Sequence, residues 1–114
     1  MWYTMIMSEL KNKKCVPCEV GAPPLSADVI AQHLVQLNPE WKVMDGKKIV
    51  RSFIFKDFKD ALVFANSVGD CAEQEGHHPD LYVAWGKVTV ELWTHAVGGL
   101  SENDFILAAK IDAL

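Results

Sequence analysis

Three of the four histidines of this 114-residue chain lie close together in the sequence, at His77, His78 and His95. Gly76 precedes the adjacent pair and Pro79 follows it, so the backbone is defined on both sides of the pair. Histidine is the only side chain with an unperturbed pKa near neutrality, about 6.5, so it can both give and accept a proton there. The pattern therefore predicts general acid–base chemistry.

A predicted hairpin brings the pair and the third histidine together. Strands are expected over residues 81–85 and 87–94, with Gly86 near the turn. In such a hairpin the start of the first strand lies beside the end of the second. The pair precedes the first strand and His95 follows the second. We therefore expect imidazole rings from the pair and from His95 to line one cleft that reaches solvent.

Other interpretations of these histidines are open. A single histidine near the end of an element more often caps or packs than catalyses. Three histidines and a water also form a catalytic zinc arrangement. Against zinc, neighbours in an extended segment such as His77 and His78 point to opposite sides, and neither H-x-H nor H-x-x-x-H occurs. His33, on an expected helix far from the others, is assigned no role.

Three cysteines, Cys15, Cys18 and Cys71, form an odd number in a chain without an evident secretion signal, which favours free thiols in a reducing cytosol. Cys15 and Cys18 have the C-x-x-C spacing of half a zinc site, but no second half supplies the remaining ligands. The glycine- and proline-rich stretch that follows disfavours a redox motif. We expect an N-terminal tail at 1–24, a single domain at 25–114 and no metal site.

The composition excludes several classes of function. The chain has 11 basic and 15 acidic residues, a formal net charge of -4, and no run of more than two basic residues. Nothing therefore draws a nucleic-acid backbone to a basic face. No stretch approaches the roughly 20 apolar residues of a membrane span, and residues 1–7 lack the basic region of a signal peptide. We predict a cytoplasmic protein that binds neither nucleic acid nor membrane.

Capping residues and hydrophobic periodicity define the expected elements. Ser26 and Ser101 are placed as N-caps, Asp45-Gly46 suits a tight hairpin turn, and Gly76 suits the left-handed end of a long helix. The expected helices span 26–37, 57–75 and 101–114, and the expected strands span 41–44, 49–55, 81–85 and 87–94. The expected buried face of the long helix is Phe58, Ala61, Leu62, Ala65, Val68, Gly69 and Ala72. The order α-β-β-α-β-β-α predicts an α+β fold, a four-stranded antiparallel sheet covered on one face by helices.

The sheet is also expected to leave apolar surface uncovered. Its last strand alternates between two sets of side chains that face opposite sides, Val88/Val90/Leu92 and Thr89/Glu91/Trp93. Helices can cover only one side, so Trp93 with Phe53 or Ile54 would leave more apolar surface than a monomer usually shows. Sheet edges would be exposed too. We expect self-association; the alternative cover is the start of the tail, with Trp2, Tyr3 and Ile6.

A long, gapped pattern of residues resembles the signature of the pterin-4a-carbinolamine dehydratases. It consists of Glu73, His77-His78-Pro79, Trp85, His95 and Asp104. The similarity extends to Trp41, to Lys56-Asp57-Phe58 and to Gly98-Gly99-Leu100-Ser101. It covers residues 25–114.

The resemblance implies a hydro-lyase, 4a-hydroxytetrahydrobiopterin dehydratase. Such an enzyme eliminates water from the 4a-carbinolamine that aromatic amino acid hydroxylases leave, and yields quinonoid dihydropterin for recycling to tetrahydrobiopterin. The leaving hydroxyl gains a proton while N5 loses one, which suits histidines and requires no cofactor. The implied catalytic residues are His77, His78 and His95. The implied partners are the pterin, a functionally coupled hydroxylase and further copies of the chain in a homodimer or homotetramer.

Three further residues are expected to contact the substrate: Glu73, Trp41 and Thr94. Glu73 matches the acidic position of the signature, but it could equally be a solvated residue of the last helical turn. Trp41 matches an aromatic of the pterin cleft, but it could equally be core. Asp104 is expected to cap a helix and Trp85 to pack. A different class of function, a non-catalytic dimeric interaction or regulatory module on the same fold, is disfavoured because a scaffold has no need of three histidines.

Overall fold

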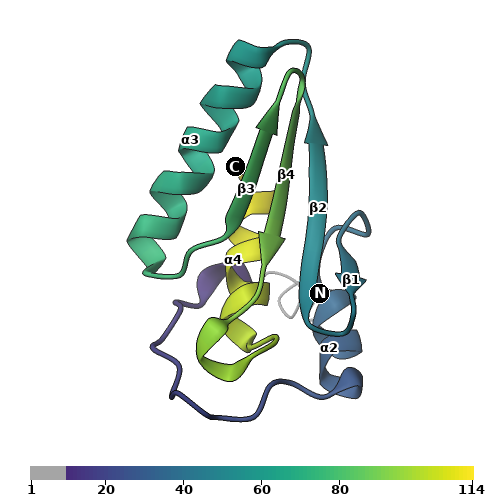
Figure 1. Cartoon of the computed structure of the whole chain (residues 1–114), viewed down its shortest axis with the longest axis vertical. Helices are drawn as coiled ribbons and strands as arrows, with labels where there is room; N and C mark the ends of the chain where they lie inside the picture. The colour runs from purple at the N-terminus through teal and green to yellow at the C-terminus, as the bar shows by residue number, and fades with distance from the viewer. Residues whose placement is uncertain (1–9) are drawn as a thin grey trace.

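A computed structural model describes residues 10–114 of the chain. Its elements are α2 (Ala27–Leu34), β1 (Lys42–Met44), β2 (Lys48–Ile54), α3 (Phe58–Glu75), β3 (Asp80–Ala84), β4 (Lys87–Leu92), the 3-10 helix η1 (His95–Val97) and α4 (Glu102–Asp112). The predicted order α-β-β-α-β-β-α and the α+β class are confirmed. Helices α3 and α4 contact each other, and α3 lies along β3 and β4 (Figure 1).

The sheet is built from the two predicted hairpins. Its strand order is β1-β2-β4-β3, and every neighbouring pair is antiparallel. The β1–β2 turn contains Asp45 and Gly46, which both have positive φ, 55° and 66°, as a tight hairpin turn requires. At the open end of the other hairpin, Asp80 at the start of β3 pairs with Glu91 near the end of β4. The segments before β3 and after β4 are therefore neighbours.

One face of the sheet carries the core. Val88, Val90 and Leu92 on β4 are fully buried, which follows from the alternation of side chains along a strand. Phe53, expected as a candidate for the uncovered face, lies on this covered face instead. It is paired with Val88, and its ring centroid is 4.6 Å from that of Phe64 on α3.

The opposite face is uncovered in the described part of the chain. Ile54 is 75% exposed and Tyr82 is 55% exposed. At one end of the sheet, Lys48 at the start of β2 and Glu91 near the end of β4 form an ion pair at 2.9 Å. The face therefore combines apolar side chains with paired charges. Trp2, Tyr3 and Ile6, the alternative cover, lie outside the described residues.

Helix α3 packs through its small residues. Its buried side chains are Ala61, Ala65, Val68 and Ala72. The expectation that Phe58 and Leu62 share this face is wrong, because both are exposed. Phe64 on the other flank of the stripe contacts Phe53 and Phe55 of the sheet. This aromatic contact rotates the helix so that Phe58 and Leu62 lie at the edge of the buried stripe.

Helix α4 lies at the centre of the fold. Ser101 and Asp104 form a capping box at its start, as the sequence predicts. Most of its side chains, including polar Asn103 and Asp104, are buried. A helix covered on nearly all sides needs no strong amphipathic pattern, and its polar residues must find partners inside the protein.

The described part of the N-terminal segment packs on this same helix. Leu10 is buried in the core, and Lys13 pairs with Glu102 at 2.9 Å. Further along, the backbone N–H of Gly21 donates to the carbonyl oxygen of Ala96. Residues 10–24 therefore lie against the body formed by 25–114.

Two tryptophans have contrasting environments. Trp85, expected to pack, is 73% exposed, because it lies in the turn between β3 and β4, at the tip of the hairpin. Trp41 is fully buried, and its indole N–H donates to the Asp112 carboxylate at 2.9 Å. The expectation that Trp85 packs is therefore wrong in the single chain. Trp41 was expected either to line the pterin cleft or to belong to the core, and its position is that of a core residue.

Two glycines provide a test of this packing. A Cβ at Gly69, inside α3, would meet nothing within 4 Å, so Gly69→Ala should raise the free energy of unfolding by about 0.5–1 kcal/mol. Gly86 has a φ of +71°, and a Cβ there would lie 2.9 Å from the carbonyl oxygen of Phe55. Gly86→Ala should therefore lower that free energy by about 1–3 kcal/mol. Urea unfolding measures both shifts, and shifts of the same sign would contradict the packing.

Candidate active site

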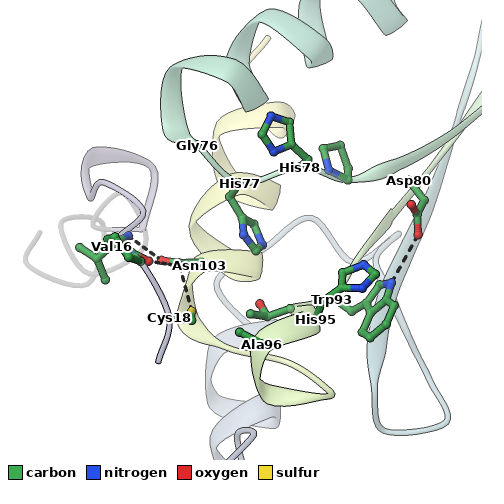
Figure 2. A pocket seen from close by; sticks show the side chains of 13 residues that line it. Val16, Cys18, Gly76, His77, His78, Asp80, Trp93, His95, Ala96 and Asn103 are labelled. Atoms are coloured by element: carbon green, nitrogen blue, oxygen red, sulfur yellow. Dashed lines mark hydrogen bonds between the residues drawn. The ribbon is translucent and has the colours of Figure 1, made fainter. Parts of the chain in front are cut away.

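A pocket of about 380 Å³ lies where the histidine-bearing segments meet (Figure 2). Its lining residues are 16–18, 76–80, 93–96 and Asn103. They include His77, His78 and His95, so the open end of the β3–β4 hairpin brings all three histidines to one pocket. The pocket also includes parts of the N-terminal segment and of α4, which the hairpin argument did not anticipate.

His77 is the most enclosed of the three histidines. Gly76 ends α3 in the left-handed conformation, with a φ of 65°, and turns the chain so that His77 points toward α4 (Figure 2). The His77 side chain is 12% exposed, and its Nε2 lies 2.6 Å from Oδ1 of Asp104. A short contact to a carboxylate fixes the orientation of the imidazole, and Nδ1 is then the ring nitrogen that does not contact Asp104.

Asp104 joins His77 to two other parts of the fold. Its carboxylate is fully buried. Oδ2 accepts hydrogen bonds from the backbone N–H of Ser101 at 2.9 Å and from the hydroxyl of Thr94 at 2.8 Å. The Thr94 and Ser101 hydroxyls are themselves 2.7 Å apart. Asp104 therefore performs the predicted capping and also positions His77, and the hydroxyl of buried Thr94 is directed toward this network.

His95 is held differently. It begins η1, which Trp93 and Thr94 separate from the end of β4, and it is exposed. Its ring stacks on that of Trp93, with centroids 3.7 Å apart and an interplanar angle of 32°. The Trp93 indole in turn donates a hydrogen bond to Asp80 at 3.3 Å. Stacking on an anchored tryptophan therefore restricts the His95 ring at the pocket mouth (Figure 2).

His78, like His95, is exposed. Its Nε2 contacts a carboxylate oxygen of Glu73 in the last turn of α3, and both side chains are largely exposed. A contact between side chains at such exposure contributes little to stability. Glu73, expected near the substrate, therefore contacts a pocket histidine without lining the pocket itself.

Trp41 does not lie at this pocket. It is buried beside α2 and borders a separate hollow of about 730 Å³, whose other lining residues are Ala31, Leu34, Val35, Leu37, Pro39, Lys42 and Val43. That hollow contains one titratable side chain and no histidine. We therefore regard the histidine pocket as the candidate active site.

Sequence reasoning missed Asn103 and the segment 16–18 as pocket residues. The side chain of Asn103 pairs with the backbone of Val16 and contacts Cys18 (Figure 2). No periodicity or motif connects residues that are more than 80 positions apart. The one available signal was Asn103, a polar residue shortly before the apolar run 105–109 of the expected last helix, which required a partner.

The thiol of Cys15 lies behind the pocket wall in an unusual setting. Burial, and to a lesser extent the nearby charge of Glu75, raise its pKa to about 12. Burial alone would also raise the pKa of Glu75, but a hydrogen bond from the Cys15 backbone N–H and the charge of Lys110 lower it. Burial likewise raises the pKa of Cys71. Cys15 and Cys71 are therefore poor nucleophiles in the folded protein.

No three His, Cys, Asp or Glu side chains within residues 10–114 are arranged to hold a metal ion. Cys15 and Cys18 instead engage α4. The Cys15 thiol contacts the carbonyl oxygen of Asn103 at 3.6 Å, and the Cys18 thiol accepts from the Asn103 amide at 3.3 Å.

Comparisons with known proteins point in one direction. The family profile for pterin 4 alpha carbinolamine dehydratase matches residues 23–114. A protein of Alkaliphilus metalliredigens is 52% identical over 93% of this chain and 96% of its own length. One of Chlorobaculum tepidum is 51% identical over 95% and 99%. Both are named as candidate pterin-4-alpha-carbinolamine dehydratases.

Two solved structures share the fold. The transcriptional coactivator/pterin dehydratase of Brucella melitensis has a TM-score of 0.73 and 36% identity, and the match covers 79% of this chain and 96% of that one. A pterin dehydratase-like RuBisCO assembly factor of the alpha-carboxysome has a TM-score of 0.55 and 20% identity, over 65% and 87%. The second likeness indicates the fold alone.

The chemistry of Cys15 can be tested with iodoacetamide at pH 8.5. The raised pKa should slow alkylation of Cys15 in the native protein by about 100-fold or more relative to the urea-unfolded chain, because the thiolate is the nucleophile. Cys18 is the internal comparison, and peptide mass spectrometry measures both. Because the folded pKa lies above the ordinary value of 9.0, this contribution to stability is present below pH 9 and is lost as the pH rises toward 12. Equal native and unfolded rates would contradict the burial.

Proposed function

This chain belongs to the pterin-4a-carbinolamine dehydratase family, and from that premise we propose that it eliminates water from a 4a-hydroxytetrahydropterin. The observation that carries the proposal for this chain is the convergence of His77, His78 and His95 on one pocket. Within it, one histidine is fixed by a buried carboxylate. The other two are accessible to a substrate.

The proposed reaction requires one proton donor and one proton acceptor. The C4a–O bond breaks, and the hydroxyl takes a proton and leaves as water. N5 loses its proton, and its electron pair forms the C4a=N5 double bond of quinonoid dihydropterin. No electrons are exchanged with another molecule. A positioned acid–base pair contributes about 10²–10⁴-fold to the rate of such a step.

The contacts of the histidines suggest a division of these tasks. Oδ2 of Asp104 already accepts two hydrogen bonds, as a carboxylate does, so we place the shared proton of the short contact on Nε2 of His77. Nδ1 of a neutral His77 then carries the lone pair of a general base. His95 and His78, which are more exposed, are the proposed proton donors to the leaving hydroxyl.

The specific substrate that we propose is 4a-hydroxytetrahydrobiopterin, which an aromatic amino acid hydroxylase would supply in the cytoplasm. The family supports the pterin. The coupled hydroxylase is what the resemblance to the family implies, since these enzymes act on the 4a-hydroxyl that aromatic amino acid hydroxylases leave. Among the described residues no helix has the length and apolar character to cross a bilayer.

A second candidate function is a non-catalytic interaction module on the same fold. The Brucella protein carries the names of both a transcriptional coactivator and a pterin dehydratase, which supports this candidate. A direct dehydration assay with freshly generated 4a-hydroxytetrahydropterin separates the two functions, because a pure interaction module would not accelerate water loss.

We further propose that the protein self-associates, as a dimer at least. Ile54 and Tyr82 on the open face of the sheet and Phe58, Leu62 and Val63 on α3 are exposed in the single chain. Exposed apolar groups on two surfaces are typical of protein contacts. Within residues 10–114, the edge strand β3 also pairs on one side only, and a free strand edge favours association.

The catalytic assignment predicts that His78→Ala or His95→Ala lowers the dehydration rate more than tenfold, within the range of about 10²–10⁴-fold for acid–base catalysis. Circular dichroism should show that both variants stay folded. His33→Gln is the matched control, because His33 lies on α2 away from the pocket, and its activity per folded molecule should equal that of the wild type. Wild-type rates in both alanine variants would contradict the assignment.

Chelators provide the second control for this prediction. The proposed mechanism uses no metal, so activity should survive prolonged treatment with EDTA or 1,10-phenanthroline. Complete loss of activity that zinc restores would instead support the zinc-dependent alternative.

Self-association predicts a solution mass of at least twice 12.7 kDa. Multi-angle light scattering at micromolar concentration measures it. A charge on the open face, as in Ile54→Lys, should lower the mass if the sheet forms the contact, and Leu62→Lys should do so if α3 does. A monomeric wild type would contradict self-association and favour coverage by the start of the chain.

A further inference from the structure

The N-terminal segment forms one wall of the histidine pocket. Val16, Pro17 and Cys18 line it together with the histidine-bearing loops. In Figure 2 this segment lies across the first turn of α4, on the side of the pocket opposite Asp80 and Trp93. A pocket enclosed only by the β3–β4 hairpin and α4 would be open on that side.

A buried asparagine holds the wall in place. Asn103 is 5% exposed. Its Oδ1 accepts from the backbone N–H of Val16 at 3.0 Å, and its Nδ2 donates to the carbonyl oxygen of Val16 and to the thiol of Cys18. All three hydrogen bonds of this amide are thus made with residues 16–18, and the two with the Val16 backbone form a two-point contact that resembles strand pairing.

The hydrogen bonds between Asn103 and residues 16–18 form a clamp, and two other contacts flank it. On one side the backbone N–H of Cys15 donates to Glu75 at 2.9 Å, and Lys110 pairs with Glu75 at 3.6 Å. On the other side the backbone N–H of Gly21 donates to Ala96, beside His95. The segment is therefore anchored before and after the pocket, so the clamp acts on a short, defined stretch.

This wall is an addition to the matched family domain. The family profile begins at residue 23, and the Brucella structure is matched over 96% of its own length while a fifth of this chain stays uncovered. The Alkaliphilus relative, in contrast, covers 93% of this chain, and so extends to residues before 23. The segment is thus a feature of some relatives, on a domain that is matched without it.

We propose that Asn103 is a positioning residue that holds residues 16–18 as a wall of the pterin pocket, and that Cys18 in this wall contacts the bound pterin. This inference rests on the proposed function. The wall acts on binding, because it adds contacts to a ligand whose protons are handled by histidines on other segments. Interactions of that kind raise KM when they are lost and leave kcat nearly unchanged.

Kinetics of Asn103→Ala provide the first test. Loss of the clamp should raise KM for the 4a-hydroxytetrahydropterin about tenfold, the effect of one or two lost hydrogen bonds, with kcat changed less than about threefold. Val20→Ala is the matched control, since Val20 is 90% exposed and lies outside the pocket. Because Asn103 adjoins Asp104, a second variant acts from the other side. Val16→Pro removes the N–H that donates to Asn103, leaves α4 unaltered and should give the same rise in KM.

Alkylation of Cys18 provides a readout that does not depend on turnover. Iodoacetamide should modify Cys18 several-fold more slowly when 7,8-dihydrobiopterin, a stable pterin, is bound. Asn103→Ala and Val16→Pro should abolish this protection and speed the reaction without ligand. Peptide mass spectrometry distinguishes Cys18 from Cys15 and Cys71.

The two readouts separate the possible failures. An active enzyme whose variants keep the wild-type KM and whose Cys18 is not protected by the pterin would overturn the wall while leaving the dehydratase intact. A wild type that neither dehydrates the substrate nor binds the pterin would overturn the proposed function itself.

Discussion

The site depends on the hydrogen bonds of the buried Asp104 carboxylate. Burial of an ionised carboxylate away from water costs several kcal/mol of folding free energy unless its oxygens accept hydrogen bonds from the protein. Here the partners come from three separate parts of the chain: the N-terminus of α4 through Ser101, the end of β4 through Thr94 and the loop after α3 through His77. The need to satisfy one charge therefore fixes the positions of three segments relative to one another, and the pocket is formed where they meet.

The three histidines consequently differ in how firmly they are held. His77 is enclosed and bound to Asp104, His95 is exposed but stacked on Trp93, and His78 contacts the exposed carboxylate of Glu73. An acid–base pair works best when one member has a fixed orientation and tautomer, because reorganisation at the moment of reaction is then small. A more accessible partner can exchange its proton with water between turnovers. This gradation is consistent with a pocket in which the three imidazoles do not perform equivalent tasks.

The sequence predicted those parts of the molecule that local rules govern. Caps, turn glycines and alternation gave the element order and both hairpins, and the hairpin argument anticipated that the histidines share one rim. The errors arose where tertiary packing decides. Phe64 rather than Leu62 faces the sheet, Phe53 lies on the covered face, and Trp85 extends beyond the body into solvent. The contact of Asn103 with residues 16–18 lay beyond prediction, because a side-chain amide that pairs with a backbone over so long a separation leaves no periodic trace.

Helix α4 connects the chemistry of the pocket to its shape. Consecutive residues in its first turn, Asn103 and Asp104, point to different sides of the helix, and one holds the N-terminal wall while the other holds His77. Both are buried and fully partnered, so neither can move without leaving polar groups unpaired. A displacement of this turn would therefore change the enclosure of the pocket and the orientation of its fixed histidine together. The wall needs no scaffold of its own, because the capped start of α4 that holds it is itself held by hydrogen bonds to Thr94 and His77.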